Sequence, residues 1–354
     1  MKTKKLECGS VYKGTLADGC VMCAEGSKMV LFVTGKCTTG CSYCPVSAER
    51  MGKDVIYANE AHVNDFSEII DEAESMDAKG TGITGGDPLL DMDRTLKIIH
   101  LLKDRFGREH HIHLYTSTLD PEKVKLLAGA GLDEIRFHPP AETWCSISET
   151  PLPEIMKIEN ISIGLEIPAL PDKKNDMLAL IKDASELGVH FININELEFS
   201  ESNWNMMERF GYELKDDLSS AVLGSEQIAL ECVFASSVPI HFCSSVFKDS
   251  VQLRRRLIRR AEHTAKPYDI ITEDGTILKG LLYTDDIENT MDLLKNEYDV
   301  PDELMFPDPE KKRLEVAAWI LEEIASELPY GCYISEQYPT ADGLEVERIP
   351  LNRK

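Results

Sequence analysis

The segment "VTGKCTTGCSYCPVS", residues 33–47, decides how the rest of the chain is interpreted. It places Cys37, Cys41 and Cys44 within eight residues, with the spacing C-x3-C-x2-C, in a loop rich in Gly and Thr. An iron–sulfur cube has four irons, each of which takes one external ligand, and thiolates are the usual protein ligands. A loop with three thiolates therefore leaves one iron free to bind a small molecule, an arrangement suited to catalysis rather than to electron transfer alone.

The composition is that of a soluble protein with one large domain and a smaller one: 354 residues, of which 43% are apolar and 28% charged. No apolar stretch follows the opening "MKTKKLEC", and no run is long enough to cross a bilayer, so we expect neither a signal peptide nor a membrane span. Ten cysteines without an export signal indicate the reducing cytoplasm, where thiols serve metals or chemistry.

The formal net charge of −24, from 62 acidic and 38 basic residues, disfavours nucleic acid as the main partner. One basic segment stands apart from this, "LRRRLIRRAEHTAK" at residues 253–266. On a helix its arginines would cover most of the polar face; they are Arg254, Arg255, Arg256, Arg259 and Arg260. A solvated helix face is the favoured interpretation, and a docking patch for an acidic partner or a phosphate-bearing substrate is the alternative.

From residue 29 the chain alternates β-branched runs with amphipathic helical stretches, a pattern typical of parallel strands joined by crossover helices. The predicted strands are 29–33, 80–84, 111–116, 133–138, 161–168 and 190–195. The predicted helices are 64–79, 92–107, 120–131, 152–158 and 175–188, several of them beginning at Asp or Asn and ending at Gly. Six such strands form either a partial barrel or a doubly wound sheet, with the active groups at the carboxyl ends of the strands.

Two unusual loops follow the first two predicted strands. The cysteine loop comes directly after strand 29–33, and "TGGDP" (84–88) comes directly after strand 80–84. Because the carboxyl ends of parallel strands lie at one edge of the sheet, we expect these two loops to face the same space.

The alternation ends near residue 245, which predicts a smaller α+β domain at 246–354 after the barrel region at 29–245 and an N-terminal extension at 1–28. Residues 268–283 predict a hairpin about Asp274 and Gly275, since apolar residues alternate on both sides of this pair. Helices are predicted at 285–297 and 309–327, and short strands at "CYIS" and "LEVERI".

The stretch "CTTGCSYC", with an aromatic residue before the last cysteine, resembles the C-x3-C-x-aromatic-C motif of the radical S-adenosylmethionine (radical SAM) enzymes. The resemblance implies a partial (β/α)6 barrel in which Cys37, Cys41 and Cys44 hold a [4Fe–4S] cluster and Tyr43 lies near the adenine of S-adenosylmethionine. It further implies reductive cleavage of that cofactor to methionine and a 5′-deoxyadenosyl radical, which abstracts hydrogen, and a ferredoxin- or flavodoxin-type electron donor. A structural zinc site with a remote fourth ligand is the alternative.

The "TGGDP" stretch resembles the Gly-Gly-Glu-Pro turn of the same family. By that resemblance Gly85, Gly86 and Asp87 hold the amino group of the cofactor's methionine, although Asp87 is one methylene shorter than the usual glutamate. Two glycines let the main chain come close to a ligand, and a carboxylate suits an ammonium group. Within the family, residues 29–200 are most similar to the pyruvate formate-lyase activating enzymes and their archaeal relatives.

Polar residues at the ends of the later strands are further candidates for cofactor binding: Ser117, Thr118, His138, Glu166, Asn195 and Glu196. The resemblance implies that such residues bind the ribose hydroxyls and the methionine carboxylate. The alternative is that each caps a helix or forms a turn. Glu166 lies inside the apolar strand "IGLEIP", and we expect a buried donor to compensate for the cost of burying its carboxylate.

A second group of cysteines begins with Cys20 and Cys23, a C-x2-C pair typical of half of a zinc site or of a second iron–sulfur cluster. The preferred completion is Cys243 with either Cys8 or Cys232, and His241 is a further candidate ligand. The alternative is that these cysteines are buried apolar residues or a redox pair. Cys145 and Cys332 are predicted to be ordinary core thiols.

Two functions of different kinds follow. The first is a radical SAM enzyme of an anaerobic cytoplasm, whose substrate we rank as a protein or peptide, then a small metabolite or cofactor precursor, then tRNA. The second is a zinc-containing module that binds RNA or protein without catalysis, an interpretation based on the cysteine pairs and the arginine run.

Overall fold

The computed structural model describes residues 1–352, and the chain divides into two compact units. The larger comprises residues 1–74 and 78–253, and the smaller comprises residues 75–77 and those from 254 onward. The boundaries expected from the sequence, after residues 28 and 245, remain predictions. Among residues 1–352 there is no helix with both the length and the apolar character needed to cross a membrane.

The larger unit is built on an 11-stranded sheet that contains all six predicted strands, paired in parallel. These are β3 (Lys28–Phe32), β6 (Gly80–Thr84), β7 (His111–Thr116), β8 (Glu134–Phe137), β9 (Ser162–Ala169) and β10 (Phe191–Glu196). A seventh parallel strand, β11 (Ile240–Cys243), pairs with β10. Strands that are buried on both faces are nearly continuous runs of β-branched and other apolar residues. The observed bounds therefore lie close to the predicted ones.

Antiparallel strands extend the sheet at both edges, and the sequence pattern did not predict them. β1 (Thr3–Lys5) and β2 (Val11–Lys13) form a hairpin, and β2 pairs with β11. At the other edge β4 (Ile56–Ala58) pairs with β3 and with β5 (Ala61–Val63). The result is a large, mainly parallel sheet of α/β type, which confirms the predicted fold class.

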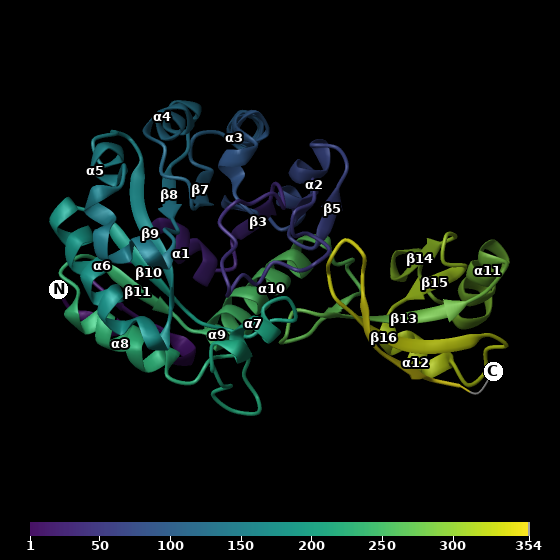
Figure 1. Cartoon of the computed structure of the whole chain (residues 1–354). Helices are drawn as coiled ribbons and strands as arrows, with labels where there is room; N and C mark the ends of the chain where they lie inside the picture. Colours follow the sequence, from purple (N-terminus) through teal and green to yellow (C-terminus); the bar gives the residue numbers. More distant parts are fainter. Residues whose placement is uncertain (353–354) are drawn as a thin grey trace. The chain divides into compact units, whose positions relative to one another are not determined.

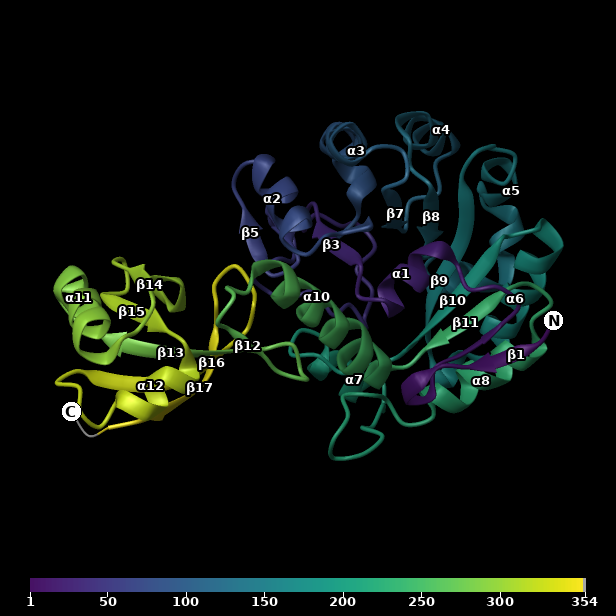
Figure 2. The same cartoon turned by 180° about the vertical axis from the view of Figure 1, so that it is seen from behind.

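Helices cover the outer side of this sheet (Figures 1 and 2). They are α2 (Ser67–Ser75), α3 (Met92–Phe106), α4 (Pro121–Ala130), α5 (Leu152–Ile155), α6 (Lys174–Leu187) and α8 (Ser225–Ala235). The Asp91 and Asp120 side chains accept hydrogen bonds from the first turns of α3 and α4. Gly131 and Gly188 end α4 and α6 in the left-handed conformation, as the sequence predicted.

One short helix, α1 (Asp18–Ala24), lies on the inner side of the sheet and carries the C-x2-C pair (Figure 2). It approaches β7 and β8 so closely that a Cβ atom on Gly19 would lie 2.4 Å from His113 Nδ1. Only glycine fits at this point. Within the N-terminal extension, α1 therefore packs on the inner side of the sheet, while β1 and β2 extend the edge of the sheet.

Two further short helices belong to the larger unit: α7 (Trp204–Arg209) and α9 (Ser245–Phe247).

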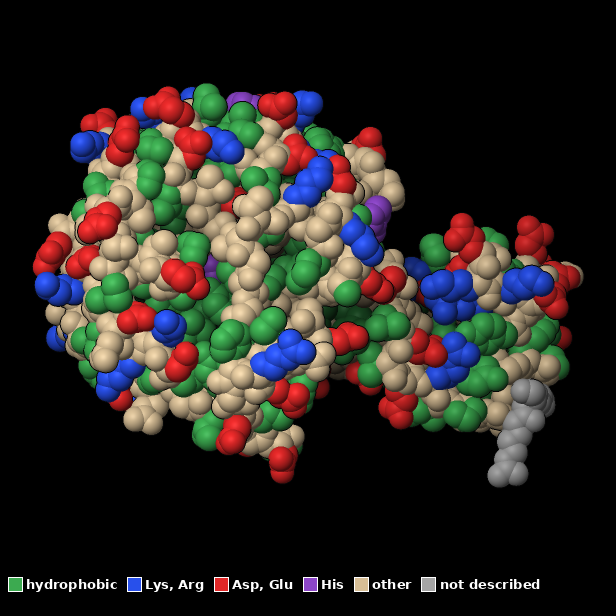
Figure 3. All heavy atoms as spheres, in the orientation of Figure 1, with side chains coloured by type: hydrophobic (Ala, Val, Ile, Leu, Met, Phe, Trp, Pro, Cys, Tyr) green, Lys and Arg blue, Asp and Glu red, His purple; other side chains and the backbone are tan. Residues whose placement is uncertain are grey.

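On the face that Figure 3 shows, the Lys and Arg side chains of the described residues are interspersed with Asp and Glu rather than gathered into one basic patch.

The smaller unit is an antiparallel sheet with helices. Its strands follow the order β14 (Met305–Asp308), β15 (Arg313–Val316), β13 (Ile277–Tyr283), β16 (Gly331–Gln337) and β17 (Glu345–Pro350), and β12 (Ile270–Ile271) also pairs with β13. Its helices are α10 (Arg254–Thr264), α11 (Ile287–Tyr298) and α12 (Ala318–Ile324). The predicted hairpin at 268–283 is confirmed. The helix predicted over 309–327 is wrong in its first half, because residues 313–316 form β15.

The arginine run lies on α10, as expected, but it is not simply a solvated face. Arg259 Nε donates to the main-chain oxygens of Met76 and Asp77, at 2.9 and 3.0 Å, and its guanidinium pairs with the Asp77 carboxylate. Arg260 is only 8% exposed and donates to Pro339 O and Ser75 Oγ. Both arginines therefore anchor α10 within its own unit.

Candidate active site

The cysteine loop and the "TGGDP" turn meet directly through their main chains. Gly86 N donates to Thr34 O at 2.6 Å, and Asp87 N donates to Lys36 O at 2.7 Å. A Cβ atom on Gly85 would lie 2.5 Å from Thr34 O, and one on Gly86 would lie 2.3 Å from Lys36 O. The two glycines thus allow one loop to pack against the other, and their contact with a ligand stays a prediction.

This close approach predicts that Gly86→Ala separates the two loops. A side chain forced against a backbone oxygen that cannot move away costs about 1–3 kcal/mol. We expect a loss of that size in the free energy of urea unfolding and weaker retention of iron after anaerobic loading. Gly129→Ala, within α4, serves as the control, because its backbone is helical and no heavy atom lies within 4 Å of its added Cβ; equal losses in both variants would contradict the prediction.

Asp87 is fully buried and its carboxylate is already engaged by neighbouring donors. It accepts hydrogen bonds from three successive side-chain hydroxyls at the end of β7 and directly after it, those of Thr116, Ser117 and Thr118, at 2.6, 2.8 and 2.7 Å. It also caps the following turn by accepting from Leu89 N at 3.0 Å. The carboxylate therefore fixes the loop after β7 against the "TGGDP" turn, and its contact with a cofactor ammonium stays a prediction.

Ser117 joins a third loop to these two. Its hydroxyl lies 2.7 Å from Thr39 Oγ1 in the cysteine loop while it donates to Asp87. The ends of β3, β6 and β7 are therefore linked by one hydrogen-bonded network around the three cysteines, as the expected common edge of the sheet requires.

The three thiols of the loop differ in their exposure. Cys37 is exposed, whereas Cys41 and Cys44 are partly buried. Burial raises the pKa of both Cys41 and Cys44, and the neighbouring thiols of the loop raise it further. Three such thiols are costly to ionise together without a cation, so the donor set fits an iron-containing centre that would compensate three thiolates.

Tyr43 connects the cysteine loop to the later strands. Its hydroxyl lies 3.0 Å from His138 Nε2, and the two rings meet edge to face with their centroids 5.7 Å apart. His138 Nδ1 lies 2.8 Å from Glu166 O. Burial lowers the pKa of His138 and raises that of Tyr43, so both side chains are neutral at pH 7. The structure thus brings Tyr43, His138 and the main chain of Glu166 together.

Glu166 has the buried donors that its position in an apolar strand requires. Arg136 Nη1 donates to it at 2.9 Å, Asn193 Nδ2 at 3.0 Å and Asn195 Nδ2 at 2.8 Å. Arg136 also pairs with the buried Glu134, at 2.5 Å. Burial alone would raise the pKa of Glu166, but the charge of Arg136 and the hydrogen bonds from the two amides hold it below its ordinary value.

The lowered pKa of Glu166 predicts a specific pH dependence. A carboxylate with a folded-state pKa below its ordinary value of 4.5 contributes stability above pH 4.5 and loses it as the pH falls through the folded value. We expect Glu166→Gln to cost about 1–3 kcal/mol at pH 7. Urea unfolding at several pH values should show this difference shrinking below pH 4.5, and a difference that grows on acidification would contradict the assignment.

Several residues that hold the cysteine loop were not predicted from the sequence. Asn203 Nδ2 donates to Tyr43 O at 3.1 Å, and Ser202 Oγ donates to Cys44 O at 3.2 Å. On the other side Asp54 pairs with Lys36 and Arg94, at 3.0 and 2.6 Å. The only signal in the sequence was that Ser202 and Asn203 follow a predicted strand; their partners lie far away in the chain.

The second group of cysteines is only partly gathered. Burial raises the pKa of Cys20, Cys23 and Cys243, with that of Cys20 at about 12, and the thiols of Cys20 and Cys23 contribute to the shift of Cys243. Cys8 is exposed, and its main-chain oxygen accepts a hydrogen bond from Ser244 Oγ, beside Cys243. Cys232 lies on α8, on the outer side of the sheet, so the structure does not bring it to the others.

The two remaining cysteines differ from each other. Cys332 is buried, as predicted. Cys145 is exposed and its thiol lies 3.4 Å from Asp176 Oδ1, so the prediction of a core thiol was wrong for Cys145.

Within residues 1–352, no three Cys, His, Asp or Glu side chains lie close enough together to hold a single metal ion. Ligands of a four-iron cube bind different irons, so the cysteine loop does not need that closeness.

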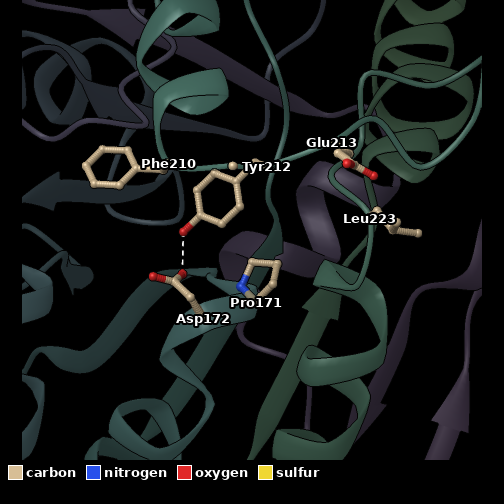
Figure 4. Close-up of a pocket in the computed structure, with 7 residues that line it drawn as sticks. Pro171, Asp172, Phe210, Tyr212, Glu213 and Leu223 are labelled. Carbon is tan, nitrogen blue, oxygen red and sulfur yellow. Dashed lines mark hydrogen bonds between the residues drawn. The ribbon is translucent and has the colours of Figure 1, made fainter.

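Two neighbouring pockets open beside the cysteine loop. The first is lined by residues 39–43 of the loop, by residues 140–142 after β8, by Leu170, Asp172 and Lys173 after β9, and by Phe210 and Tyr212. The second shares Asp172, Phe210 and Tyr212 with it and adds Pro171 and Leu223 (Figure 4). The Tyr212 hydroxyl donates a hydrogen bond to Asp172. This bond joins the segment after α7 to the turn after β9 in the wall that the two pockets share.

Comparison with known proteins agrees with this geometry. Residues 31–194 match the model of the radical SAM superfamily. A protein of Methanocaldococcus jannaschii, provisionally named a glycyl-radical enzyme activating enzyme, is 42% identical over 362 residues, which cover 96% of this chain and 94% of that protein. The chain belongs to the radical SAM superfamily.

As a radical SAM enzyme, the protein has a [4Fe–4S] cluster and S-adenosylmethionine as its implied cofactors. This membership does not support the alternative of a zinc module without catalysis. Residues 275–351 match a domain of unknown function, DUF8061. A radical S-adenosylmethionine methyltransferase from Kitasatospora setae, solved with cobalamin and a [4Fe–4S] cluster, has a TM-score of 0.36 and 14% identity, covering 52% of this chain and 37% of that one; a likeness this weak carries no argument.

Proposed function

We propose that this radical SAM enzyme binds its [4Fe–4S] cluster through Cys37, Cys41 and Cys44 and activates a glycyl-radical enzyme, so that its substrate is a polypeptide. The single observation that carries the cofactor assignment is the direct main-chain contact between the cysteine loop and the "TGGDP" turn. The contact places three thiols and the double-glycine turn at one edge of the sheet, where the ends of the later strands also lie.

When bound, the cluster and S-adenosylmethionine would supply one electron and a carbon radical able to abstract hydrogen. The chain's own residues position these groups. Thr39, Ser117 and Asp87 hold the cysteine loop to the neighbouring loops, while Tyr43 and His138 close its other side. In this proposal Gly85, Gly86, Ser117, His138, Glu166 and Asn195 surround the cofactor, which the pocket beside residues 39–43 would admit.

The polypeptide substrate rests on the name of the relative from M. jannaschii and on the exposed wall of the pocket. Phe210 and Leu223, at the outer side of this wall, are 58% and 54% exposed. Exposed apolar side chains beside a pocket are typical of a surface that receives another macromolecule. A small metabolite would not need them.

The test has two stages, so that cofactor chemistry and substrate are judged separately. The full chain, loaded anaerobically with iron and sulfide, should release 5′-deoxyadenosine from S-adenosylmethionine when it is reduced by flavodoxin or dithionite. The loaded enzyme is then mixed with glycyl-radical enzymes from a methanogen or a fermenting bacterium, and the glycyl radical is sought by electron paramagnetic resonance.

The two stages fail in different ways. Absence of 5′-deoxyadenosine from a fully loaded protein would overturn the cofactor assignment. Release of 5′-deoxyadenosine without a glycyl radical on any candidate, together with hydrogen loss from a small metabolite instead, would leave the cofactor site in place and overturn the polypeptide substrate.

A further inference from the structure

The segment after β10 exposes several large apolar side chains. Met206 and Phe210 are four residues apart at the end of α7, so they lie on one side of it. Phe210 and Leu223 line the same pocket. Exposed apolar side chains that cluster in this way mark surfaces that bind another molecule. We call the set the 204–223 surface, and its members are Trp204, Met206, Phe210, Leu214, Leu218 and Leu223.

These side chains are not exposed because the segment lacks a core. Met207, Ala221 and Val222 are fully buried beneath it. Main-chain hydrogen bonds of 2.8 Å, from Val222 N to Leu197 O and from Lys215 N to Ala221 O, fasten the segment to the end of β10 and close it into a hairpin-like loop. The segment therefore keeps its fold without help from the apolar side chains that face outward.

The tip of this loop presents a leucine to solvent. Leu218 is 99% exposed. The Asp216 carboxylate fixes the turn by accepting hydrogen bonds from Leu218 N and Ser219 N, at 2.9 and 2.8 Å. Apolar surface in water costs free energy, and a partner that covered the side chain would remove this cost.

The charge around the 204–223 surface is negative. Residues 201–224 contain five acidic and two basic residues, and one of the basic ones, Lys215, is already paired with two carboxylates outside the surface. Lys173 pairs with Asp176 at 3.3 Å and so does not neutralise its neighbour Asp172. Among residues 1–352 neither Asp172 nor Glu213 forms an ion pair. These carboxylates are therefore free to receive a cation from a partner.

An apolar pocket brings one of these carboxylates and the surface together (Figure 4). Pro171, Phe210 and Leu223 line it, and its volume is about 220 Å³, on the scale of one amino-acid side chain. The Tyr212 hydroxyl donates to Asp172 Oδ1, and burial together with this carboxylate raises the pKa of Tyr212, so the phenol keeps its proton and stays the donor. Asp172 Oδ2 has no hydrogen-bond partner within the described part of the chain.

The surface is continuous with the cysteine loop. Asn203 and Ser202, directly before α7, donate to Tyr43 O and Cys44 O at 3.1 and 3.2 Å. Phe210 also lines the pocket beside residues 39–43. A molecule bound along the 204–223 surface would therefore reach the cysteine loop.

We propose that the 204–223 surface binds the polypeptide substrate through a segment in which an arginine or lysine is flanked by apolar residues, and that the pocket beside Asp172 receives the basic side chain. This inference rests on the proposed function, which makes a polypeptide the substrate. A methylene stem packs against Pro171 and Leu223, while the cation suits both a carboxylate oxygen and the face of the Phe210 ring. The net charge of −24 would attract such a segment from a distance and repel an acidic one.

The experiment measures binding of a short fluorescein-labelled peptide to the full chain by fluorescence anisotropy. The peptide carries two arginines among leucines, around a central glycine. We expect it to bind, and to bind more weakly at high salt. Versions with glutamate in place of arginine, or serine in place of leucine, should bind at least about tenfold more weakly. Phe210→Ala and Leu218→Ser should each weaken binding of the first peptide about tenfold, and Asp172→Asn about fivefold.

Two matched controls should leave the affinity unchanged. Phe234→Ala removes a phenylalanine that is equally exposed but lies on α8, and Glu109→Gln removes an exposed carboxylate between α3 and β7. Binding indifferent to both Phe210→Ala and Asp172→Asn, or a preference for the glutamate peptide, would overturn the proposal. So would a dimer of this chain that Leu218→Ser dissociates in sedimentation, because a second copy would then occupy the surface.

Peptide binding requires neither the cluster nor S-adenosylmethionine, so its outcome is independent of the cofactor chemistry. A glycyl radical formed on a partner without any binding of the arginine peptide would overturn the docking surface and leave the proposed function in place. Binding of the peptide at Phe210 and Asp172 without a glycyl radical on any candidate would do the reverse.

Discussion

Replacing any one of Cys37, Cys41 and Cys44 by alanine is expected to abolish S-adenosylmethionine cleavage and to reduce iron and sulfide to background. A cube that needs three thiolates from one loop cannot keep its position with two, because the loop supplies no spare donor among residues 33–47. Iron and sulfide analysis after anaerobic loading, with 5′-deoxyadenosine release measured on the same samples, checks both expectations together.

Cys145→Ser is the control for this series, since its thiol is exposed and lies outside the network of the cysteine loop. It should retain full iron content and full cleavage. A Cys41→Ala protein that kept its iron and still released 5′-deoxyadenosine would show that the loop does not hold the cluster.

The second large effect is expected from Arg136→Met. Arg136 is 2% exposed and holds two carboxylates, Glu134 and Glu166, that are themselves buried. Removing one partner of a buried ion pair leaves its counter-charge uncompensated, and this costs about 3–5 kcal/mol. Urea unfolding at pH 7 should show a loss of this size, whereas Lys182→Met, at an exposed cation on α6, should change stability very little.

The direction in which the stability loss of Arg136→Met changes with pH distinguishes a charge effect from a simple loss of packing. Without Arg136 burial would raise the pKa of Glu166, so the folded variant takes up protons more readily than the unfolded chain. Its deficit should therefore shrink as the pH is lowered from 8 toward 5 and grow as the pH rises. Adding Glu134→Gln and Glu166→Gln to Arg136→Met should restore part of the lost stability; a further loss would contradict the charge explanation.

The parallel strands were predictable because each is specified by its own local sequence pattern. β6 and β7 occupy the predicted residues, since a run of β-branched residues bounded by Gly or a polar turn has few other uses. The cysteine loop and the "TGGDP" turn were likewise placed correctly at one edge, because parallel strands bring their carboxyl ends together. Both inferences needed only the order of elements along the chain.

What the sequence could not predict depends on distant partners. Residues 313–316 belong to an amphipathic helical pattern, yet they pair with β13 and β14, so tertiary contacts override the local preference. The three hydroxyl partners of Asp87 were not predictable, because they lie at the end of a different strand. Asn203 and Ser202 had no distinguishing pattern at all. In each case the contact that determines the structure joins segments far apart in the chain, and no local sequence pattern indicates that they meet.

The pairing of β2 with β11 has a consequence for how the protein reaches its native state. Ser10 and Ser244, which are hydrogen-bonded to each other, are 234 residues apart in the chain. Residues 3–13 are synthesised before the strand that accepts them, which is the last of the seven parallel strands along the chain. Contacts so remote raise the contact order and slow folding, so the first segment must wait, exposed to proteases and chaperones, until nearly the whole unit has been made.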